Sequence, residues 1–104
     1  MISFLTKFPM NYPILFGIGS QFADAIDSLS ANIAEGFGRY HKKDKIKFYY
    51  NARGSTYESL SWLEKAKDRK LLTPEEYTKI IKTLKEIPLE INKLIVYTNR
   101  KLDK

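Results

Sequence analysis

The sequence predicts an all-α protein, an up-down helical bundle in a single domain that spans residues 1–104. Apolar residues recur at the helical period in three separate segments, and no segment shows the apolar–polar alternation that is typical of β-strands. A chain of 104 residues also buries a smaller fraction of its surface than a larger domain does. We therefore expect the bundle to self-associate.

The first helix is expected from about Gln21 to Glu35, with Ser20 as its N-cap. Its apolar positions follow the helical period: Phe22, Ile26, Leu29, Ile33 and Phe37. Most of its other side chains are small, which predicts a central helix that neighbours approach closely on several sides. Gly36 and Gly38 are expected to end it, because glycine takes the left-handed conformation after a helix at little cost.

The second helix is expected from Asp44, as its N-cap, to Arg69 or Lys70. Its packing side is expected to consist of two adjoining rows: Phe48, Ala52, Ser55, Ser59, Trp62 and Ala66, and next to them Tyr49, Thr56, Leu60 and Leu63. Gly54 lies in mid-helix, where glycine costs about 1 kcal/mol relative to alanine. This placement predicts that another helix approaches closely at Gly54.

The third helix has the clearest start signal in the chain. Thr73 is the expected N-cap, Pro74 the first helical residue, and Glu76 completes a capping box. Pro88 removes one backbone donor, which predicts a kink near Glu86–Ile87. The apolar positions of this helix are Tyr77, Ile80, Ile81, Leu84, Ile87, Ile91, Leu94, Ile95, Thr98 and Leu102.

Polar residues form a stripe along the first helix. Ser28, Asn32 and Glu35 lie at i, i+4 and i+7 and so share one face. Because a lone buried polar group costs free energy, this stripe predicts a fixed packing surface. We expect it to meet a second stripe, within the protomer or across a subunit boundary: Asn51, Gly54 and Glu58.

Charge and composition narrow the function classes. The net charge of +6 favours acidic partners, with nucleic acid first, an anionic membrane second and an acidic protein third. The absence of cysteine excludes disulfides and thiolate metal sites and fits a reducing, cytoplasmic location. No transmembrane span is evident. Residues 1–25 resemble a secretion signal only weakly, and we expect no cleavage there.

Catalysis is not expected from this sequence. His41 is the only histidine, so one chain cannot form a Ser-His-Asp triad or a histidine metal cluster. Glu35 and Glu58 lack a second acid in register, which favours hydrogen-bonded structural roles. The Gly36–Gly38 segment follows a helix and is not a phosphate loop. We expect no enzymatic activity, no cofactor and no metal.

A basic segment between the first two helices is the candidate nucleic-acid site: Arg39, Lys42, Lys43, Lys45 and Lys47. Tyr40 lies within it, and cations beside aromatic rings suit backbone contact and base stacking. The alternative is a solvated loop beside an oligomer interface. Tyrosine and arginine favour such interfaces, so a second stripe is expected at a subunit boundary: Ile46, Tyr50, Arg53 and Tyr57.

Several short motifs carry a family resemblance. They are Phe8-Pro9, Gly17, Ser20-Gln21, Ser28, Asn32-Ile33-Ala34-Glu35-Gly36, Ala52-Arg53-Gly54-Ser55, Glu58 and Leu60. In these motifs the chain resembles the bacterial four-helix-bundle proteins encoded in intervening sequences of large-subunit ribosomal RNA genes. The accessory variability proteins of diversity-generating retroelements are relatives of that family.

The resemblance implies an up-down bundle of the four-helix type, a homopentameric assembly and no known catalytic activity. The family's first helix normally precedes Phe8-Pro9, so Met1–Lys7 imply a truncated first helix here. The retroelement relatives imply binding to RNA or DNA and to a reverse transcriptase through a basic surface. Residues in the matched motifs would have structural roles: Ser28, Asn32, Glu35, Gly36, Gly54, Ser55 and Glu58.

Two functions therefore remain open at this point. The first is a nucleic-acid-binding accessory factor that uses the basic segment. The second is a structural or protein-interaction module without nucleic-acid binding. Neither function requires a membrane.

Overall fold

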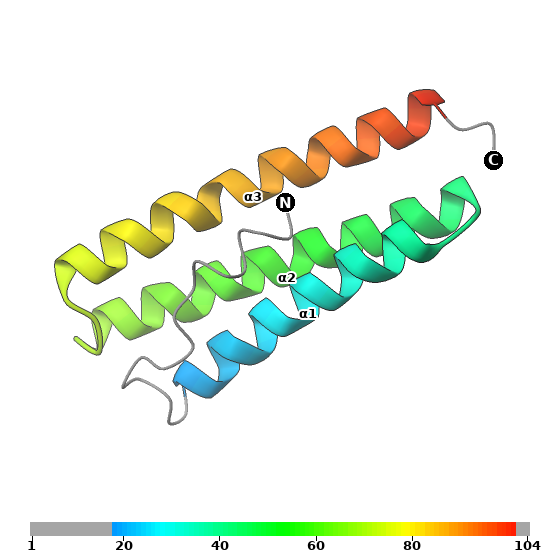
Figure 1. Cartoon of the computed structure of the whole chain (residues 1–104). Coiled ribbons are helices and arrows are strands. Elements are labelled where there is room, and N and C mark those ends of the chain that lie inside the picture. Colours follow the sequence, from blue (N-terminus) through cyan, green and yellow to red (C-terminus); the bar gives the residue numbers. More distant parts are fainter. Residues whose placement is uncertain (1–17, 102–104) are drawn as a thin grey trace.

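The computed structural model describes residues 18–101, which fold into three antiparallel helices: α1 (Ile18–Gly38), α2 (Lys42–Asp68) and α3 (Pro74–Lys101). Short turns join them, and no strand occurs in this part of the chain (Figure 1). The predicted all-α class is confirmed. The truncated first helix, the Phe8-Pro9 motif and Leu102 lie outside the described residues.

The central helix is α2, which packs against both α1 and α3 (Figure 1). The prediction that the small-residue helix is central is therefore wrong. The reason is that α1 buries only one side, and its small residues Ala31 and Ala34 face solvent. In contrast, α2 buries two rows with heptad spacing, the geometry by which bundle helices interdigitate. These rows are Tyr49, Thr56 and Leu63, and Ala52, Ser59 and Ala66.

The buried polar groups of α2 are satisfied within the helix. The Thr56 hydroxyl donates to the Ala52 carbonyl at 2.9 Å, and the Ser59 hydroxyl donates to the Ser55 carbonyl at 2.9 Å. These bonds to the preceding turn let hydroxyl side chains fill a tight seam without an unpaired donor. The core then closes with the apolar row of α3: Ile80, Leu84, Ile87, Ile91 and Ile95.

The end of α1 differs from the prediction. The helix extends through Gly36 to Gly38, and neither glycine has the left-handed φ expected of a stop. Instead the Lys45 ammonium donates to the Gly36 and Phe37 carbonyls at 3.2 and 3.1 Å. A cation on the last carbonyls of a helix satisfies them and opposes the negative end of its dipole. Residue Lys45 therefore caps α1.

The end of α2 and the start of α3 lie close to the predicted positions, whereas Ser20, the predicted N-cap of the first helix, lies inside α1. The Thr73 amide donates to Glu76 at 2.8 Å and the Glu76 amide donates to Thr73 at 3.1 Å, which completes the capping box of α3. At the end of α2, Lys70 takes a left-handed φ of 58°. Its amide and that of Leu71 bond back to α2, as in a Schellman motif. Helix α3 continues without a break through the buried Pro88.

Candidate nucleic-acid interface

The basic segment is mostly helical rather than a loop. Helix α2 begins at Lys42, two residues before the predicted Asp44, so only residues 39–41 form the turn. Residue His41 is the N-cap, with an extended backbone and no side-chain capping bond. The first amides of α2 therefore lack a side-chain acceptor from His41, and lysines stand where the helix dipole is already positive.

Two cations of the segment have contacts within the protein. The Arg39 guanidinium pairs with Glu35 at 3.0 Å and lies over the Phe48 ring at 4.8 Å. As described above, Lys45 caps α1. Glu35, predicted to belong to a polar packing stripe, therefore serves as the partner of Arg39 at the surface.

Three lysines of the segment remain available to an external anion. Lys42 is partly exposed, whereas Lys43 and Lys47 are fully at the surface, one helical turn apart. None of the three forms an ion pair within residues 18–101. Tyr40 stands beside them with 89% of its surface exposed, and its ring makes a T-shaped contact with the His41 ring at 5.3 Å between centroids.

The polar stripes of α1 and α2 meet at one point. The Ser28 and Ser55 hydroxyls share a hydrogen bond of 2.9 Å, and the Asn32 amide group donates to the Ser28 carbonyl at 2.8 Å. Glu58 lies exposed on α2, away from this contact. The predicted meeting of the stripes is thus made through Ser55 and not through the row of Asn51, Gly54 and Glu58.

The two motif glycines have opposite surroundings. A Cβ at Gly36 would lie 2.5 Å from the Tyr49 ring, so this glycine allows the close approach of α1 and α2. A Cβ at Gly54 would meet nothing within 4 Å. The predicted close contact at Gly54 is therefore absent within the protomer, because that position faces solvent between Tyr50 and Tyr57.

The expected subunit-interface stripe is divided between core and surface. Ile46 packs against the hydrophobic core, because α2 turns this position toward the interior. Arg53 bridges the helices: its guanidinium donates to Asn92 of α3 at 2.8 Å and lies over the Tyr50 ring at 4.7 Å. Tyr50 and Tyr57 remain about half exposed.

The antiparallel topology brings a further cationic group to the same end of the bundle. The last turns of α3 and the α1–α2 turn lie at one end of the molecule (Figure 1). There α3 carries Lys93, Arg100 and Lys101, with the exposed Tyr97 among them. Sequence reasoning missed these residues, although basic residues in a last turn were a readable signal, because their proximity depends on how α3 folds back along α2.

The perturbed ionisable groups of the surface lie at the opposite end, near the α2–α3 turn. A hydrogen bond from Tyr77 and the nearby Lys67 ammonium hold the pKa of Glu64 below its ordinary value. The same carboxylate raises the pKa of Tyr77 and of Lys67. In the interior, burial raises the pKa of the Tyr49 hydroxyl. Acids and histidine form no cluster that could hold a metal ion within the described residues.

The described helices include none that is both long and apolar enough to cross a membrane. No curated protein matches the chain. The family model of the 23S rRNA-intervening sequence proteins matches residues 2–93. The match covers most of this chain and includes every motif from Ser20-Gln21 to Leu60. The chain therefore belongs to the 23S rRNA-intervening sequence protein family.

Proposed function

We propose that this protein is a non-enzymatic, self-associating nucleic-acid-binding factor. Its primary contact is the start of α2 together with the α1–α2 turn, which we call the basic end: Tyr40, Lys42, Lys43 and Lys47. RNA or DNA would bind there through its phosphate backbone. The proposal omits Lys45 and Arg39, which were predicted contacts, because each has a partner inside the protein.

The observation that carries the proposal is the placement of lysines without ion-pair partners at the positive end of α2. Lys42 and Lys43 lie in the first turn, where cations oppose the helix dipole and do not stabilise the helix, and Lys47 follows in the second turn. Here no acid within residues 18–101 pairs with Lys42, Lys43 or Lys47. An external polyanion would neutralise these charges and would also face the first amides of α2.

Binding across a salt series tests the proposal. Each phosphate contact releases condensed counterions, so affinity should fall as salt rises, with little regard to sequence. Replacing Lys42, Lys43 and Lys47 together by glutamate should weaken binding by about tenfold or more. The slope of log K against log salt should flatten by about 0.7–0.9 for each lysine–phosphate pair that the substitution removes.

A matched variant controls for net charge. Lys79, Lys82 and Lys85 are exposed on the first half of α3, away from the basic end, and their replacement by glutamate changes the total charge equally. This control should keep most of the affinity. The proposal is wrong if the wild type binds neither RNA nor DNA at low salt, or if both triple variants bind equally.

A structural or protein-interaction module is the second candidate. The observation that favours it is a set of exposed apolar side chains on α2 and α3: Tyr50, Tyr57, Leu89 and Val96. Tyrosine is enriched at protein interfaces. If the wild type binds no nucleic acid but forms a discrete oligomer, this second function takes the place of the first.

A further inference from the structure

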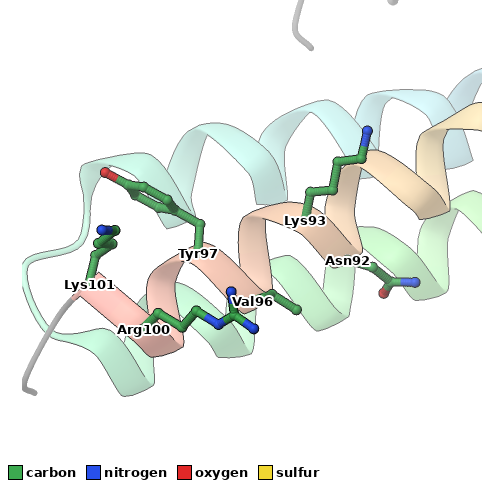
Figure 2. Close-up of a pocket in the computed structure, with 6 residues that line it drawn as sticks. All are labelled: Asn92, Lys93, Val96, Tyr97, Arg100 and Lys101. Atoms are coloured by element: carbon green, nitrogen blue, oxygen red, sulfur yellow. The ribbon is translucent and has the colours of Figure 1, made fainter.

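A shallow groove of about 390 Å³ lies on the outer surface of α3 near its end. Six residues line it, in two rows of i, i+4 spacing (Figure 2): Lys93, Tyr97 and Lys101, and Asn92, Val96 and Arg100. Successive residues of each row are therefore about 6 Å apart along the helix axis. We call this surface the α3 groove.

The first row of the α3 groove places an aromatic ring between two cations. Tyr97 is 62% exposed, and Figure 2 shows its ring standing out from α3 with Lys93 on one side and Lys101 on the other. The Lys93 ammonium forms an exposed ion pair with the Glu90 carboxylate at 3.5 Å. Arg100 and Lys101 form no ion pair with any residue between 18 and 101.

One residue of the second row is joined to the rest of the bundle. Asn92 accepts the hydrogen bond from Arg53 that joins α3 to α2. Val96, next to it in the groove, supplies an exposed apolar surface. The groove thus has a rigid helical floor, one exposed ring and cations along its edges, which is the composition of a base-stacking platform.

Charge complementarity selects the occupant. Three of the six lining residues are cationic and none is acidic. A second copy of this chain would bring its own positive charge of +6 to that surface. A polyanion with flat apolar rings, by contrast, matches both the cations and the tyrosine.

We propose that the α3 groove binds unpaired bases of a single-stranded nucleic acid, with Tyr97 as the stacking residue and Arg100 and Lys101 as phosphate contacts. This inference rests on the proposed function and deepens it, because it assigns the ligand as a single strand. Bases in a duplex are stacked on one another and cannot pack on Tyr97. The strand would continue from the basic end to the groove at the same end of the bundle (Figure 1).

The cations at the end of α3 have a second explanation, because they also stabilise the negative end of the helix dipole without any ligand. Tyr97 distinguishes ligand binding from this helix stabilisation, because the dipole does not require a tyrosine. The test therefore uses two single-stranded oligonucleotides of equal length, one with bases and one abasic. Both carry the same phosphates, and fluorescence anisotropy at fixed salt compares their affinities for the full-length protein.

Wild type should bind the base-bearing strand more tightly than the abasic strand. Tyr97→Ala should weaken the base-bearing complex by roughly 5- to 150-fold, as expected for the loss of one stacked base, and should leave the abasic complex unchanged. Tyr97→Phe keeps the ring and should bind like wild type. Arg100→Ala with Lys101→Ala should weaken both complexes and lower the salt slope by about 0.7 per phosphate bound by these two residues.

Leu71→Ala is the control, because Leu71 is also exposed but lies at the α2–α3 turn, at the opposite end of the bundle. The proposal is overturned if Tyr97→Ala behaves like Leu71→Ala, or if it weakens base-bearing and abasic strands equally. A change in oligomer mass of Tyr97→Ala by native mass spectrometry would assign the groove to a chain–chain contact instead. If the wild type binds both strands equally, the inference about the α3 groove is overturned and the proposed function is not. If the wild type binds neither strand, the proposed function is overturned as well.

Discussion

At the residue scale, single contacts hold the helices at fixed distances. Gly36 gives Tyr49 the space to lie against α1, and the Phe37 and Tyr49 rings then form a T-shaped pair at 5.9 Å between centroids. Ser28 and Ser55 fix the same helix pair with a shared hydrogen bond. Small residues therefore set the α1–α2 distance, while large residues fill the seam around them.

Replacing Gly36 by alanine tests this contact. The added Cβ would lie 2.5 Å from the Tyr49 ring, which is only 2% exposed and has little room to move. We expect the variant to lose about 1–3 kcal/mol of unfolding free energy from overpacking, despite the better helix propensity of alanine. Gly38→Ala is the control, since nothing lies within 4 Å of that position. Urea melts should show a loss for Gly36→Ala alone.

The contact between Glu64 and Tyr77 predicts a pH dependence. Because the folded-state pKa of Glu64 lies below its ordinary value of 4.5, the contact stabilises the fold above that pH and its contribution disappears as pH falls through the lowered pKa. Tyr77→Phe removes the donor. It should cost at most about 1 kcal/mol near neutral pH, because the pair is partly solvated.

Thermal melts of wild type and Tyr77→Phe between pH 7 and pH 2 would measure this effect. The difference in midpoint should shrink toward zero in acid. A difference that stays constant over the whole pH range would mean that only packing of the ring, and not ionisation of Glu64, is responsible.

At the element scale, the position of each helix follows from the width of its apolar surface. Helix α2 buries two rows and so can contact both neighbours, whereas α1 and α3 each bury one side. The termini are fixed by identifiable devices: Lys45 on α1, the Schellman turn at Lys70 on α2, and the Thr73–Glu76 capping box on α3.

Gly54 is a mid-helix glycine without a neighbour in the protomer. In a monomer, Gly54→Leu should therefore raise the free energy of unfolding by up to about 1 kcal/mol, and the thermal midpoint with it. The physical reason is that leucine is the better helix former and meets no neighbour within the protomer. A lowered midpoint together with a decrease in oligomer mass would instead show that another subunit packs on Gly54. That outcome would agree with the close helix contact that the mid-helix glycine predicts.

At the scale of the whole molecule, the antiparallel order of the helices gathers charge at one end. The α1–α2 turn and the end of α3 are far apart in sequence but share that end (Figure 1). The side of the bundle, by contrast, exposes Tyr50 and Tyr57 on α2 and Leu89 on α3. We therefore expect the side to mediate self-association and the end to remain free for a ligand.

Native mass spectrometry tests the assembly. We expect one discrete homo-oligomer, with the pentamer favoured by the family resemblance. The exposed Tyr50 and Tyr57 supply the apolar surface whose burial would drive association. Replacing both by serine should shift the protein toward monomer without loss of helicity. A wild type that is monomeric at micromolar concentration would contradict this prediction.

The sequence by itself determined those features that depend only on residues close together in the chain. Helical periodicity set the three helices, and the Thr73–Glu76 capping box is visible in four consecutive letters. The apolar row of α3 was also predicted, because residues of one helix share a face whatever surrounds them. The family follows from short motifs within the helices.

Only the tertiary structure decided which helix is central, which lysines are available and which glycine is in contact. These properties depend on residues distant in sequence: Lys45 reaches back to α1, Tyr49 fills the space at Gly36, and α3 returns to bring its last turns to the end that holds the α1–α2 turn. A sequence pattern specifies the face of a helix but not the neighbour that covers it. For that reason the all-α class was predictable from the sequence, whereas the α3 groove was not.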